Sequence, residues 1–176
     1  ALAAILPLLG CGEEAAIVSF DRLARDCSIA AASRKALKTI AEDERQHDAL
    51  LSGLQQALPQ PTADPALRRE SRRFHRALSA GSVPVHLARI AGIDAAVCTI
   101  LSHLLRSGSA VAHDPAAARV MRHIRRDEAR HVAISRSIAI ATIGRSQARE
   151  AAAQARSELA DLLAFAACAF ERIGVD

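Results

Sequence analysis

The sequence predicts an all-α protein built around a bundle of four long helices. Ala and Leu dominate its 176 residues, Gly and Pro number only 8 and 6, and Trp and Tyr are absent. This composition favours long helices, because Ala and Leu have high helix propensities whereas strands favour β-branched and aromatic residues. Apolar residues make up 51% of the chain and charged residues 24%, as in a soluble globular domain. We therefore expect a single domain over 1–176.

Breaker residues divide the chain into helical blocks. Asp64 before Pro65 and Asp114 before Pro115 are start signals, because Asp caps a helix N-terminus and Pro suits the first helical position. Gly144 separates two further helical patterns. The expected helices span about 7–32, 33–58, 64–81, 84–107, 115–143 and 146–172.

Four of these blocks are expected to pair as two antiparallel hairpins, 7–32 with 33–58 and 84–107 with 115–143. A crossover of about 25 residues joins the hairpins, begins at Pro59 and carries the short Arg-rich helix. This connectivity predicts a four-helix bundle with one long crossover, followed by a C-terminal fifth helix.

One eight-residue pattern occurs twice in the chain. The letters IAEDERQH end at His47 and the letters IRRDEARH end at His131, with Ile, Asp-Glu and His at the same spacing. Each residue advances about 100° around a helix, which places Glu44 and His47 inside the apolar stripe of their helix. Glu128 lies inside the stripe of the other helix in the same way. A solvated charge run would lie opposite the stripe, so these side chains are expected to point inward.

Each of the other two long helices offers a single inward acid. Glu13 lies at the centre of the apolar face of the first helix, and Asp94 is the only acid in the block 84–107. Burying a carboxylate is costly unless it is paired or bound to a cation. Both positions therefore indicate a partner inside the bundle.

Four carboxylates and two imidazoles suit a pair of Fe or Mn ions, since each ion needs neutralising charge and nitrogen ligation while positions stay open for oxygen or peroxide. A Glu and a His at positions i and i+3 share one helix face and can bind one metal. We predict two Fe ions as the cofactor, with Mn as the alternative. The candidate metal ligands are Glu13, Glu44, His47, Asp94, Glu128 and His131.

Asp43 and Asp127 precede the two inward Glu residues. A metal-bound imidazole usually donates its other N–H to a carboxylate. We predict that Asp43 orients His131 and that Asp127 orients His47 across the bundle.

The combined pattern resembles the ferritin-like di-metal carboxylate superfamily. The stretches GEEAAIVSF and DPAAARVMRHIRRDEARHV are most similar to bacterial ferritin-like domain proteins of unassigned activity and, secondarily, to rubrerythrins. The resemblance covers about 10–143 and implies that the six candidates ligate two metals, with Asp94 in the place of the usual Glu. The shorter Asp side chain would bind one metal terminally rather than bridge two.

The leading functional hypothesis is a di-iron oxidase or oxygenase that uses O2 or peroxide on a small-molecule substrate. No rubredoxin-like segment with four cysteines follows the bundle, so an external electron donor is expected. Three alternatives stay open: ferritin-like or bacterioferritin-like iron oxidation and storage, a non-catalytic bundle with an incomplete site, and an RNA-modifying oxygenase. Without Tyr or Trp to stack on bases, the chain is poorly equipped to bind nucleic acid.

Other features bear on surroundings and partners. The chain shows no run of about 18 apolar residues, so no membrane contact is expected. Its four Cys lack C-x-x-C spacing and are predicted to be buried reduced thiols in a cytoplasmic protein. A homodimer is expected rather than a cage.

Ser135 and Thr142 interrupt the inward face of 115–143 and predict a small polar pocket there. Surface or packing roles are expected for the histidines outside the repeated pattern, His75, His86, His103, His113 and His123.

Overall fold

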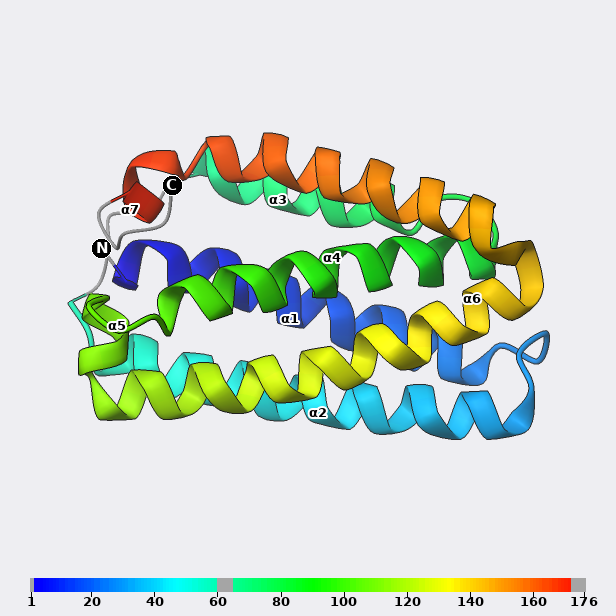
Figure 1. Ribbon diagram of the computed structural model, residues 1–176, viewed down its shortest axis with the longest axis horizontal. Coiled ribbons are helices and arrows are strands. Elements are labelled where there is room, and N and C mark those ends of the chain that lie inside the picture. Colours follow the sequence, from blue (N-terminus) through cyan, green and yellow to red (C-terminus); the bar gives the residue numbers. More distant parts are fainter. Residues whose placement is uncertain (1, 60–64, 172–176) are drawn as a thin grey trace.

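The computed structural model describes residues 2–59 and 65–171, and helices are the only regular elements within those ranges (Figure 1). The prediction of an all-α fold is confirmed. The cap predicted at Asp64 lies outside the described residues. The helices are α1 (Leu2–Arg25), α2 (Ala31–Gln56), α3 (Pro65–Leu78), α4 (Val83–Leu104), α5 (Ala110–His113), α6 (Pro115–Ala164) and α7 (Ala167–Glu171).

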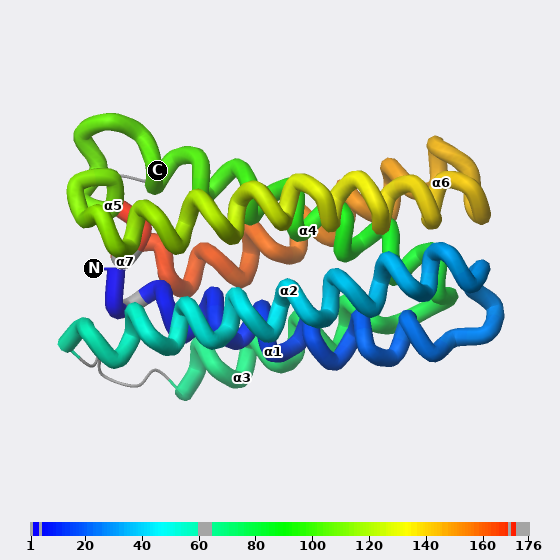
Figure 2. Tube along the Cα trace, turned by 90° about the horizontal axis from the view of Figure 1, so that it is seen from below, coloured from blue at the N-terminus to red at the C-terminus, as the bar shows by residue number. Residues whose placement is uncertain are grey.

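The helices lie roughly along one common direction. In Figure 1 α1 lies between α2 and α3, and α4 lies between the two halves of α6; Figure 2 shows the same helices along the stacking direction. The inner helices α1 and α4 therefore have neighbours on two sides. On one side are α2 and the first half of α6, and on the other are α3 and the second half of α6.

The long helix α6 reverses its direction at Gly144 (Figure 1). Gly144 has φ 78° and ψ 163°, a backbone conformation that is essentially restricted to glycine. The boundary predicted at this residue is confirmed. At the other end of α6, the Asp114 side chain accepts hydrogen bonds from the amides of Ala116 and Ala117, as expected for an N-cap.

The first helix differs from its predicted bounds. It begins at Leu2 rather than near Pro7, and Pro7 lies inside it. Ile5 and Leu6 on this first part are buried in the core, at 0% and 1% exposed. Burial of these apolar side chains outweighs the loss of one backbone hydrogen bond at Pro7.

The predicted burial of the thiols is wrong for two of the cysteines. All four are free, but Cys27 and Cys168 are exposed, while Cys11 and Cys98 are half-buried. Cys27 follows the end of α1, so the helical periodicity from which its burial was inferred does not extend to it.

The apolar helix α4 is the one described helix whose length and composition would allow it to cross a membrane. The sequence predicts no such segment, and that prediction is not confirmed. Half of the apolar window is buried within the fold, as is usual for a core helix, so this is weak evidence for a span.

His86 on α4 is 1% exposed, and neither ring nitrogen has a hydrogen-bond partner among the described residues. Burial, with smaller contributions from Arg22 and Arg89, lowers its pKa from 6.5 to about 4. Between these values the unfolded chain binds a proton that the folded chain does not. We expect the free energy of unfolding to fall as pH decreases through this window, by up to about 1.4 kcal/mol per pH unit.

His86→Leu is expected to remove this pH dependence, because leucine does not bind a proton. In the parent, the stability associated with neutral His86 is fully present above pH 6.5 and is lost as the pH falls toward 4. The measurement is a set of urea unfolding curves for parent and variant at pH values inside and above the window. A parent and variant with the same pH dependence would show that His86 is not buried in its neutral form.

Candidate metal centre

Four helices bring the six predicted ligands into one buried cluster. Each of these side chains belongs to a residue at most 9% exposed, so their predicted inward orientation is confirmed. The six are Glu13 on α1, Glu44 and His47 on α2, Asp94 on α4, and Glu128 and His131 on the first half of α6.

His47 lies at the centre of a compact group of possible ligands. Its Nδ1 is 3.2 Å from Glu44 Oε2, 3.5 Å from Glu128 Oε1 and 3.7 Å from Glu13 Oε2. One ligand atom from each of these four residues lies within 4.8 Å of the others. This group could hold a metal ion.

His131 faces the same two carboxylates from the other side. Its Nδ1 is 3.1 Å from Glu44 Oε1 and 3.7 Å from Glu128 Oε2. Glu44 and Glu128 therefore each present one oxygen to His47 and the other oxygen to His131. The two imidazole rings are 5.9 Å apart between centroids. Both glutamates lie between the two histidines, as carboxylates shared by two cations would.

Asp94 lies outside the compact group. Among the described residues, its buried Oδ2 has no hydrogen-bond partner. Leaving such a group unsatisfied costs about 1–3 kcal/mol, which a bound cation would offset. This unpartnered atom belongs to a predicted ligand, so the donor set fits a cation. Whether Asp94 ligates stays a prediction.

The contacts predicted for Asp43 and Asp127 are present. His131 Nε2 is 3.2 Å from Asp43 Oδ2, and His47 Nε2 is 3.4 Å from Asp127 Oδ2. Arg130, which sequence analysis missed, donates to both aspartates, at 2.7 Å to Asp43 and 3.2 Å to Asp127. Each imidazole thus turns Nδ1 toward the cluster and Nε2 toward an aspartate on the opposite hairpin.

Burial determines the protonation of two acids in the metal-free cluster. It raises the pKa of Glu13 well above its ordinary value. It also raises the pKa of Asp94, with a further increase from the carboxylates of Glu128 and Glu44. Both side chains are therefore held toward their neutral form while no cation is bound.

The two histidines shift in the opposite sense. Burial lowers the pKa of His47. Its hydrogen bonds with the cluster carboxylates, of which the one with Glu128 is the strongest, outweigh the effect of burial and raise that pKa to about 12. The same balance raises the pKa of His131 to about 10. Burial raises the pKa of Glu44, but its contacts with His131 and His47 lower it to about 2. Protons thus supply the positive charge that a metal would otherwise bring.

The aspartates behind the histidines give a testable expectation. We expect Asp127→Asn to lower metal affinity by about 10- to 100-fold, because a neutral amide no longer strengthens the ligating imidazole. Competition with a chromophoric chelator measures the affinity. Asp161→Asn, an exposed change on the second half of α6, is the control. Equal loss of affinity in both variants would contradict a specific role for Asp127.

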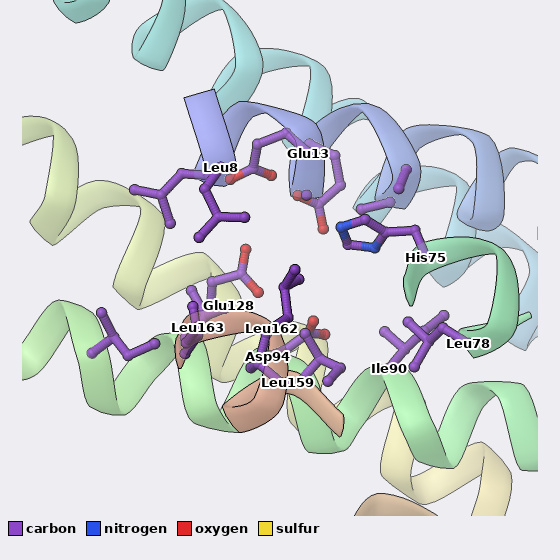
Figure 3. A pocket seen from close by; sticks show the side chains of 18 of the residues that line it. Leu8, Glu13, His75, Leu78, Ile90, Asp94, Glu128, Leu159, Leu162 and Leu163 are labelled. Carbon is purple, nitrogen blue, oxygen red and sulfur yellow. The ribbon is translucent and has the colours of Figure 1, made fainter. Parts of the chain in front are cut away.

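A cavity of about 100 Å³ adjoins the cluster on the side of α1 and α4 that faces α3 and the second half of α6 (Figure 3). Carboxylate residues of the cluster form part of its wall, and Glu13, Asp94 and Glu128 point toward it (Figure 3). The rest of the wall is mainly apolar and includes Leu8, Leu78, Ile90, Leu159, Leu162, Leu163 and Phe170.

The location of this cavity corrects one expectation. Ser135 and Thr142 do not line it: Ser135 is buried without a hydrogen-bond partner in the described chain, and Thr142 is exposed and donates to Ile138 O at 3.1 Å. His75, for which a surface or packing role is predicted, lies in its wall (Figure 3). No spacing in the sequence indicates this, because the position of His75 depends on how α3 packs on α1.

Comparison of the chain with protein-family models, curated proteins and solved structures gives no match. The observations that bear on function are therefore structural: the described residues form helices, and a buried Glu/His cluster among them could hold a metal ion.

Proposed function

We propose that this chain is a ferritin-like protein that binds two iron ions and uses O2 or peroxide to oxidise a small substrate. The observation that carries the proposal is the position of Glu44 and Glu128, each with one oxygen near His47 and the other near His131. A cluster for a single ion would not need two carboxylates that both face two separate nitrogen donors.

The ligands divide into two sets around the shared glutamates. Glu13 and His47 would hold one ion, since Glu13 Oε2 is 3.7 Å from His47 Nδ1. His131 and Asp94 would hold the other, and the buried Oδ2 of Asp94 has no hydrogen-bond partner among the described residues. Mixed carboxylate and imidazole donors suit iron, and manganese is the alternative metal.

The surrounding residues position and shield the proposed centre. Asp43 and Asp127 accept from the Nε2 atoms, which leaves both Nδ1 atoms free to bind. Arg130 balances the charge of these two aspartates. The mainly apolar wall of the cavity makes the space beside the cluster unfavourable for water. With two Fe(II) ions bound, the centre would have two electrons, one from each ion, for reduction of dioxygen or peroxide.

Anaerobic loading of metal-free protein with Fe(II) tests the proposal. We expect two irons per chain by metal analysis and a change in visible absorbance when O2 or peroxide is added. Less than one iron per chain would exclude a di-iron protein. Two irons that stay spectroscopically unchanged with both oxidants would exclude the oxidase role and leave a non-catalytic bundle.

Gel filtration of the loaded protein separates the enzyme from a storage protein. A dimer-sized species is expected. A much larger species that takes up many irons per chain would instead support iron oxidation and storage.

A further inference from the structure

A second hollow lies beside the apolar cavity and shares part of its wall. Ala15, Ser19 and His75 line both spaces. The outer hollow has a volume of about 390 Å³ and lies between α1 and α3. The two spaces therefore adjoin, one at the protein surface and the other against the carboxylate cluster.

The outer hollow is basic. Arg22, Arg72 and Arg76 line it, and Glu14 is its one acidic wall residue. In the described part of the chain, no ion pair joins any of the three guanidinium groups to a carboxylate. Val18, which is 69% exposed, adds an apolar surface at the same place. Unpaired guanidinium groups are well suited to bind a carboxylate or a phosphate.

The inner cavity has the opposite character. Its wall is mainly aliphatic, and burying an unpaired anionic group among such side chains is costly. Burial lowers the pKa of His75 to about 4, so this imidazole adds no positive charge between the two spaces at neutral pH. A cavity that binds benzene has a volume of about 150 Å³. At about 100 Å³, this one suits a slender alkyl end better than a ring.

We propose that the two spaces together bind a single-chain anionic amphiphile. Its anionic head lies at Arg22, Arg72 and Arg76, and the end of its alkyl chain passes Ala15 and His75 to the metal centre. Binding requires only the two spaces. The further statement that this molecule is the substrate rests on the function proposed above.

Calorimetry with decanoate and decyl phosphate as probes tests the binding. We expect at least one of them to bind, and the one that binds more tightly identifies the preferred head group. Acetate, which lacks the alkyl tail, and decylammonium, which carries a positive instead of a negative head, are expected to bind at least about 10-fold more weakly. Decylammonium binding as tightly as both anions would overturn the assignment of the head, and absence of binding by both anions would overturn the proposal.

Charge reversal on α3 tests the location of the head. The double variant Arg72→Glu with Arg76→Glu is expected to weaken binding of the better anion by at least about 10-fold. Arg69→Glu is the matched control, an exposed arginine of the same helix that lies outside both walls. Equal weakening in the control, or none in the double variant, would place the head elsewhere.

The orientation of the tail is tested with Mn(II)-loaded protein. We expect the proton signal of the terminal methyl group to broaden more than that of the methylene next to the head, because the methyl lies nearer the metal. The reverse order would overturn the proposed orientation. Ala15→Leu, which narrows the passage, should weaken binding while metal content and helicity are unchanged.

The two proposals fail in different ways. If the metal-centre proposal is wrong, iron content after loading is low while amphiphile binding is intact. If the amphiphile proposal is wrong, iron content is two per chain but neither anion binds.

Discussion

Replacing Glu44 with glutamine is expected to lower metal affinity by more than about 100-fold. This loss exceeds that expected for residues such as Asp127, which would only hydrogen-bond to a ligating histidine. Glu44 Oε2 is 3.2 Å from His47 Nδ1 and its Oε1 is 3.1 Å from His131 Nδ1, so one change affects both proposed metal positions. Glutamine keeps the shape of the side chain but removes the negative charge. Metal analysis after Fe(II) loading, with a chelator competition, gives the stoichiometry and the affinity.

Glu42→Gln provides the matched control for this variant. Glu42 lies two positions earlier on α2 and is exposed, whereas Glu44 is 2% exposed. The control is expected to bind two irons like the parent. Parent-like binding by the Glu44 variant would remove this carboxylate from the proposed centre.

The second large effect is expected at Gly92, where α4 meets the second half of α6. A Cβ atom on Gly92 would lie 2.6 Å from Ala152 O and 2.9 Å from Ala152 Cα. Both atoms belong to the backbone and cannot rotate away, so the helices themselves must separate. Gly92→Ala should therefore lower the free energy of unfolding by about 1–3 kcal/mol, as overpacking does.

Gly53→Ala is the control for this prediction. Gly53 is an exposed position of α2 with no atom within 4 Å of an added Cβ. It should gain about 0.5–1 kcal/mol, because alanine is the better helix former. Urea unfolding of both variants measures the difference. A stabilised Gly92 variant would contradict the close approach of the two helices.

Local periodicity explains why much of the metal cluster could be predicted. Glu44 and His47 are one helical turn apart, so their shared inward face follows from helix geometry alone. The repeat of the same spacing at Glu128 and His131 predicts a partner on another helix. The aspartate contacts followed from the chemistry of a ligating imidazole, and the distances from Asp43 and Asp127 agree with that expectation.

Features that depend on how helices pack could not be predicted in this way. Arg130 joins Asp43 to Asp127 only because the two hairpins bring residues of α2 and α6 together. The cavity depends on where α3 and the second half of α6 lie. The helical start before Pro7 depends on burial of Ile5, which a breaker rule does not consider.

The position of α1 and α4 between two sets of neighbours separates two tasks in space. With α2 and the first half of α6 they carry the candidate ligands, and with α3 and the second half of α6 they line the cavity. Neither α3 nor the second half of α6 carries a candidate ligand. The part of the wall that α3 and the second half of α6 supply could therefore be altered to suit another molecule without replacing a candidate ligand.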